Sequence, residues 1–135
     1  MARAIGTFEV KITPLPPDDP TPESQGEIPL ARLALDKQFH GDIEAISRGQ
    51  MYAAGTGVKG SAGYVALERV SGALQGRSGS FVLQHSGTMN RGTPTLSITV
   101  VPDSGTGDLG GLHGKMKVDI VEGKHFYEFE YSLTE

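Results

Sequence analysis

The feature that most constrains the fold of this chain is a two-residue alternation of apolar and polar side chains. In its first instance Phe8, Val10 and Ile12 alternate with polar neighbours, and the pattern recurs towards the C-terminus. Side chains two residues apart share one face of a β-strand, and no segment sustains the three- and four-residue spacing of an amphipathic helix over three turns. The alternation predicts an all-β protein with strands near residues 7–12, 32–39, 43–54, 63–70, 78–85, 95–101, 112–121 and 125–133.

The regular spacing of these segments predicts how they pair. Short strands separated by Gly, Asn, Asp or Ser, without helices between them, pair with their sequence neighbours as antiparallel strands. About eight such strands close most economically into a barrel, because closure leaves no exposed edge. A two-sheet sandwich is the alternative, but the glycines inside strands, Gly49, Gly79 and Gly114, favour the tighter curvature of a barrel. The 135 residues suit one barrel domain spanning the chain.

Two features interrupt the alternation. Lys37 lies on the apolar side of the second expected strand, in line with Leu35 and Phe39. Residues 14–29 hold six of the eight prolines, and proline lacks an amide donor and fixes φ, which excludes a helix or a central strand. We expect a mobile loop between the first two strands. It acts either as a lid over the barrel mouth or, as we favour, as a solvated connector.

The composition excludes several functional classes. There is no Cys, which removes disulfides, thiolate metal sites and a Cys nucleophile, and suits a reducing cytoplasm. The chain shows neither a signal peptide nor the apolar run of about 18 residues that a membrane span needs, so we expect a cytoplasmic protein without a membrane partner. The 12 Lys and Arg and the 16 Asp and Glu are scattered singly, with a net charge of −4, and form no basic stripe for nucleic acid.

A glycine pattern at residues 105–110 matches the dinucleotide-binding fingerprint. That fingerprint needs a helix directly after the glycines, whereas residues 112–120 alternate as a strand, so this segment is a hairpin connection. The four histidines show no metal-site spacing, and the two aspartates of this connection fit turn chemistry better than calcium ligation. We therefore expect no metal and no other cofactor.

The hairpin at residues 61–85 carries the candidate site. A two-residue turn at Gln75-Gly76 sets Glu68 opposite Leu83 and places Glu68 and His85 as diagonal neighbours, about 7–8 Å apart at Cα. The same strand face also carries Tyr64, Val70, Phe81 and Leu83. An ionisable pair among aromatic and aliphatic side chains suits a ligand-bearing lumen. The opposite arrangement, an exposed face on which the pair contributes little, stays open.

The residues at 39–44, 63–70, 76–85, 100–107 and 125–131, with Ser47, Gly49, Leu112 and Gly114, form a recognisable set that covers most of the chain. Together they resemble a bacterial family of unassigned function whose members fold as barrels similar to allene oxide cyclase. The resemblance implies the barrel. It implies no reaction, because a shared fold does not transfer the chemistry of the cyclase.

Three functions follow as alternatives. The first is a barrel that binds a small apolar molecule against Tyr64, Val70, Phe81 and Leu83. The second is an isomerase, cyclase or other proton-transfer enzyme in which burial raises the pKa of Glu68, the general acid or base. His85 would orient that carboxyl group, and Tyr64 would donate to a developing oxyanion. The third is a structural homo-oligomer with a packed lumen.

Overall fold

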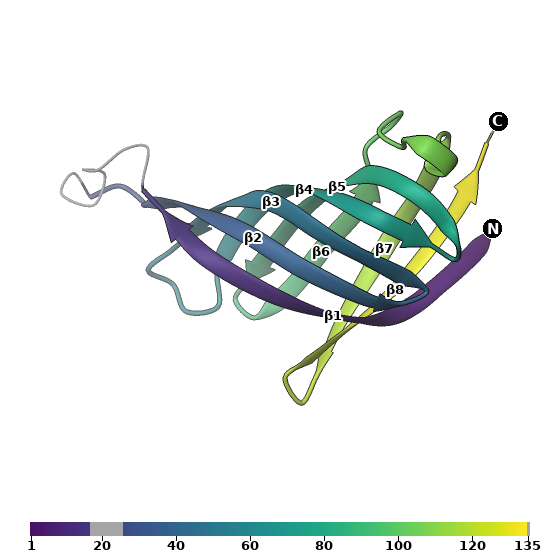
Figure 1. Cartoon of the computed structure of the whole chain (residues 1–135). Helices are drawn as coiled ribbons and strands as arrows, with labels where there is room; N and C mark the ends of the chain where they lie inside the picture. The colour runs from purple at the N-terminus through teal and green to yellow at the C-terminus, as the bar shows by residue number, and fades with distance from the viewer. Residues whose placement is uncertain (17–25, 135) are drawn as a thin grey trace.

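A computed structural model of the chain describes residues 1–16 and 26–134. In this part of the chain, eight antiparallel strands close into one barrel in sequence order (Figure 1). The all-β fold and the barrel expected from the sequence are confirmed. The strands are β1 (Ala2–Leu15), β2 (Leu30–Gly41), β3 (Ile43–Gly55), β4 (Ala62–Leu74), β5 (Arg77–Asn90), β6 (Thr93–Val100), β7 (Leu112–Val121) and β8 (Lys124–Leu133).

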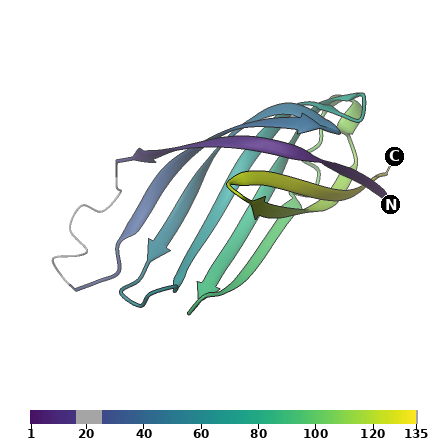
Figure 2. The same cartoon turned by 90° about the horizontal axis from the view of Figure 1, so that it is seen from below.

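Closure is uneven around the barrel. β1 pairs with β8 over a long register, whereas β6 and β7 share the single register pair Thr99–Lys115. One end of β4, β5 and β6 projects beyond the β7–β8 hairpin (Figure 2). Among the described residues, the barrel is therefore open at this end. Inward-facing apolar side chains there stay accessible, since Leu96 is 47% exposed and Met89 is 40% exposed.

The opposite end is closed by aromatic packing. The Phe129 ring stacks on the Phe81 ring at 5.8 Å and on the Tyr131 ring at 5.3 Å, measured between centroids. A short 3₁₀ turn, η2 (Gly107–Leu109), adds the buried side chain of Leu109 to the same hydrophobic cluster. Large aromatic side chains contribute most of the apolar area that a small core buries, so this end carries much of the stability.

Tyr127 ties β8 to the turn between β2 and β3. Its buried hydroxyl accepts a hydrogen bond from the Ile43 amide at 2.8 Å and donates one to the His40 carbonyl at 2.8 Å. Burial raises the pKa of Tyr127 to about 12, so the hydroxyl keeps its proton and its donor role. The contact fixes the closed end across strands that are distant in sequence.

The register of the β4–β5 hairpin follows the turn expected from the sequence. Gln75 and Gly76 have φ values of 46° and 85°, the left-handed conformations that a two-residue hairpin turn requires. Leu74 then pairs with Arg77, and Glu68 lies opposite Leu83. The predicted pairing is confirmed.

Two expectations concern the connections between strands. Residues 105–110 lead into strand β7 rather than a helix, as predicted for a hairpin connection. Most of the proline-rich segment expected at residues 14–29, namely residues 17–25, lies outside the described residues; its flanks are β1, ending at Leu15, and β2, beginning at Leu30. In the described ranges no helix is long and apolar enough to cross a membrane.

Gly49→Ala should lower the free energy of unfolding by about 2 kcal/mol. A Cβ at position 49 would lie 2.1 Å from the Leu67 carbonyl oxygen and 2.6 Å from Glu68 Cα, and this backbone moves only if β4 shifts. Urea unfolding measures the change. Gly57→Ala is the matched control, because no atom lies within 4 Å of a Cβ there. Equal stability of the two variants would contradict the close approach of β3 and β4.

Candidate functional site

The face shared by Glu68 and His85 points into the barrel. Glu68 is 1% exposed and His85 is 5% exposed, although both are polar. Their strands alternate strictly at this level, so Ala66 and Leu83 face inwards and are buried, while Leu67 and Gln84 face outwards and are exposed. The structure thus selects the interior arrangement that the sequence left open.

A third ionisable side chain completes the cluster. Lys37 Nζ on β2 lies 2.8 Å from Glu68 Oε2, and His85 Nε2 lies 3.3 Å from the same oxygen. The Lys37 side chain is only 8% exposed, and its ammonium group also lies 4.8 Å from the centroid of the Phe8 ring. Both contacts to Glu68 are ion pairs by distance, and neither has the angular geometry of a good hydrogen bond.

Lys37 was missed as a site residue by the sequence reasoning. The signal was its position on the apolar side of β2, where it interrupts the pattern of Leu35 and Phe39. A long charged side chain on a buried face needs a partner of opposite charge. A search for that partner among inward-facing carboxylates would have led to Glu68.

The expected rise in the Glu68 pKa is wrong. Burial acts to raise the pKa of Glu68, but the interactions with His85 and with the positive charge of Lys37 outweigh it, and the pKa falls below the ordinary 4.5. The prediction counted desolvation alone because Lys37 had not been placed. Glu68 is therefore ionised at neutral pH and has no proton to donate as a general acid.

The cluster is incompletely satisfied by the protein. Among the described residues, four buried polar atoms of this region have no hydrogen-bond partner: both carboxylate oxygens of Glu68, His85 Nε2 and Ser47 Oγ. Ser47 pairs with Lys37 in the β2–β3 register, so both polar groups belong to the same region of the interior. Buried polar atoms without partners destabilise a fold, and in native proteins they point to a role beyond packing.

Tyr64 connects the cluster to a pocket at the open end. Its ring centroid lies 6.3 Å from that of His85, and burial together with the Glu68 charge raises the pKa of its hydroxyl. A pocket of about 260 Å³ lies beside it, lined on the inner face by Tyr64, Gly87, Met89 and Leu96. Gly87 allows the Tyr64 ring to lie close against β5, since a Cβ there would lie 2.6 Å from Tyr64 Cε1.

The other predicted ligand-binding residues lie elsewhere on the same face. Val70, Phe81 and Leu83 are at most 2% exposed and belong to the packed hydrophobic cluster. The structure places them on the inner wall with Glu68 but does not bring them to the pocket beside Tyr64.

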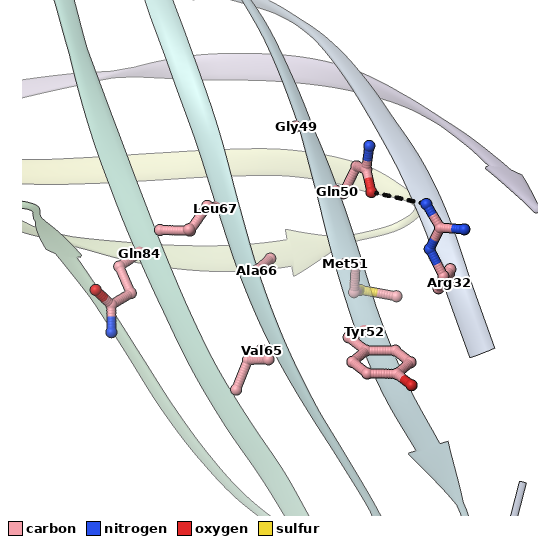
Figure 3. A pocket seen from close by; sticks show the side chains of 9 residues that line it. All are labelled: Arg32, Gly49, Gln50, Met51, Tyr52, Val65, Ala66, Leu67 and Gln84. Atoms are coloured by element: carbon pink, nitrogen blue, oxygen red, sulfur yellow. Dashed lines mark hydrogen bonds between the residues drawn. The ribbon is translucent and has the colours of Figure 1, made fainter. Parts of the chain in front are cut away.

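A larger hollow, of about 750 Å³, lies on the outside of the barrel over β2 to β5 (Figure 3). Its outward-facing apolar side chains are exposed, with Val65 and Leu67 each at 54%. At its rim Arg32 donates a hydrogen bond of 3.4 Å to Gln50 Oε1. This outer groove contains none of the buried ionisable groups, so the inner pocket is the better candidate for chemistry.

Comparison with known proteins places this barrel in a family. Residues 4–131 match a family described as "protein of unknown function (DUF3224)". The chain belongs to this family. Its structure is also similar to the crystal structure of a DUF3224 protein of unknown function from Shewanella oneidensis MR-1, with 49% sequence identity and a TM-score of 0.92, covering 100% of this chain and 99% of that chain. No curated protein matches the chain. These matches confirm the resemblance, expected from the sequence, to a barrel family of unassigned function.

Glu68→Gln should lower the free energy of unfolding by about 3 kcal/mol at pH 7, since Lys37 is then buried without its counter-ion. Folding lowers the pKa of Glu68 from 4.5, so ionised Glu68 stabilises the fold above that pH. The contribution is lost as pH falls through the folded-state pKa, and the gap between wild type and variant should shrink in acid.

Urea unfolding from pH 7 into the acid range measures this gap, with the exposed Glu27→Gln as control. Two results would contradict the ion-paired assignment of Glu68. One is a variant as stable as wild type at pH 7, and the other is a gap that widens in acid.

Proposed function

We propose that this DUF3224 protein binds a small, mostly apolar molecule at the open end of its barrel. The apolar body occupies the inner pocket beside Tyr64, and its polar end meets the Lys37–Glu68–His85 cluster. The observation that carries the proposal is the position of an apolar pocket next to a buried, incompletely satisfied ionic cluster on one inner face. Pockets of this composition, apolar with a few converging polar groups, are the usual form of small-molecule sites.

Stability alone does not account for the cluster. Two charged groups buried together lose more hydration free energy than their attraction commonly returns, and apolar residues of similar volume are often as stable or more so. Here the charges share the barrel interior with a free carboxylate oxygen, Glu68 Oε1, and a free hydroxyl, Ser47 Oγ, in the described structure. A buried ionic cluster that is kept despite this loss of hydration free energy suits recognition of a polar group on a bound molecule.

The accessible wall residues support the same proposal. Leu96 and Met89 face inwards at the open end yet stay 47% and 40% exposed. A bound molecule would remove this apolar surface from water, at roughly 25 cal/mol per Å². The alternative of a fully packed lumen fits the aromatic end of the barrel but not this end. Val70, Phe81 and Leu83 then belong to the packed core of the barrel rather than contact the molecule.

The test uses 2-naphthol, an apolar bicyclic molecule with one hydroxyl group. The chain has no Trp, so no indole emission obscures naphthol fluorescence. Gly87→Val should weaken binding roughly tenfold or more, because its side chain displaces Tyr64 into the pocket. Ser86→Val is the matched control, since Ser86 is the adjacent residue on the outer face.

Leu96→Gln provides a second variant for the case in which Gly87→Val misfolds. It places a polar group in the pocket at a position that is already half exposed, and it should weaken binding in the same direction. If 2-naphthol does not bind, or if Ser86→Val weakens it as much as the two inner variants do, the inner pocket is not the binding site.

A further inference from the structure

We propose that His85 is a general base that removes a proton from a carbon atom of the molecule bound beside Tyr64. This inference rests on the proposed binding function and adds a reaction to it. It also changes the expected roles: His85 is the reacting group, and Glu68 is a positioning residue. Three features of the interior support it, namely the orientation of the His85 ring, the charge balance of the cluster and the place of the pocket.

The contacts of the His85 ring leave one nitrogen free. Nε2 faces Glu68 Oε2 at 3.3 Å. The contact is an ion pair by distance and lacks hydrogen-bond geometry, but an ionised carboxylate repels a lone pair at that distance, so in the neutral ring the proton lies on Nε2 and the lone pair on Nδ1. The hydrogen bonds of the described residues include none to His85 Nδ1. A buried imidazole beside a carboxylate, with its second nitrogen not hydrogen-bonded, has the form of a general base.

The two charged neighbours of His85 balance each other. Lys37 and Glu68 form an ion pair at 2.8 Å, so the site is electrically balanced while His85 is uncharged. When His85 takes a proton, the new imidazolium faces the Glu68 carboxylate. The ionisable groups that face His85 are Glu68 and Tyr64 from β4 and Lys37 from β2; its register partner on β6 is Ile98, which does not titrate.

The pocket begins one inner-face position away from His85 on β5. Gly87, in the wall of the pocket, is two residues from His85 on the same inner face of β5, and the Tyr64 ring lies 6.3 Å from the imidazole. Its hydroxyl keeps its proton, because burial and the Glu68 charge raise its pKa. Tyr64 therefore can donate a hydrogen bond to an oxygen that becomes negative during the reaction.

The reaction class is proton transfer in an apolar carbonyl compound. The bond between hydrogen and the carbon next to the carbonyl breaks, the proton goes to Nδ1, and the electron pair moves to the carbonyl oxygen as an enolate. In a carbonyl compound with a β,γ double bond the enolate is a dienolate, and return of the proton from Nδ1 to the γ carbon moves the double bond into conjugation, which gives an isomer and regenerates the neutral base. Atoms and electrons balance without an oxidant, a reductant or a cofactor.

The experiment uses 5-nitrobenzisoxazole, an apolar bicyclic carbon acid. A base removes its ring C–H proton, the N–O bond breaks, and the coloured 2-cyano-4-nitrophenolate forms in one step. Wild type should exceed free imidazole at equal concentration by roughly a hundredfold, the lower range for positioned general bases. We expect His85→Gln to abolish this rate enhancement. His113→Gln, which replaces an exposed histidine, is the control and should retain it.

Two further variants separate chemistry from folding. His85→Ala opens space beside the pocket, and added imidazole should restore its rate well above the rate of the same imidazole in solution. Glu68→Gln should lower the turnover of bound probe at least tenfold more than it weakens 2-naphthol binding, as expected for a positioning residue. Loss of structure alone would produce neither result.

The inference is overturned if His85→Gln keeps the wild-type rate, or if wild type is no faster than imidazole. The two proposals fail in distinguishable ways. Binding of 2-naphthol without elimination leaves the proposed binding function standing and removes the base, whereas absence of both removes the two together.

Discussion

The buried ion pair between Lys37 and Glu68 is the interaction on which the rest of the site depends. Its 2.8 Å contact crosses the barrel interior from β2 to β4, over the intervening strand β3. Gly49 on β3 makes this approach feasible, because a side chain there would collide with the backbone of β4. The pair fixes Glu68 in its ionised form, and Glu68 in turn fixes the ring of His85. The orientation of the candidate base thus follows from a charge on another strand.

The two ends of the barrel divide stability and function. At one end stacked rings around Phe129 and the hydrogen bonds of Tyr127 form a packed, fully closed core. Towards the other end β6 and β7 are hardly paired, since they share a single register pair, and Leu96 stays about half exposed. Natural proteins commonly keep functional sites away from their stability optimum, and the remaining structure compensates. The aromatic end therefore allows the open end to hold charged groups that packing alone would exclude.

The sequence was sufficient for the fold and for half of the site. Strand alternation predicted the barrel, and the two-residue turn at Gln75-Gly76 fixed the register that brings Glu68 and His85 together. These are contacts between neighbouring strands, which local geometry determines. Lys37 on β2 reaches Glu68 on β4 across the intervening strand β3, and local pairing does not predict a contact between strands that are not neighbours. The direction of the Glu68 pKa was wrong for the same reason, because it depends on that missing charge.

The most direct test of the account is the triple replacement Lys37→Met, Glu68→Leu and His85→Leu. It exchanges the ionic cluster for apolar side chains of similar size and leaves the pocket lining intact. If the cluster serves a bound molecule, the triple variant should unfold at the same urea concentration as wild type or at a higher one. It should also lose the elimination of 5-nitrobenzisoxazole. A triple variant that is several kcal/mol less stable than wild type would show that the cluster is structural, and would contradict the account.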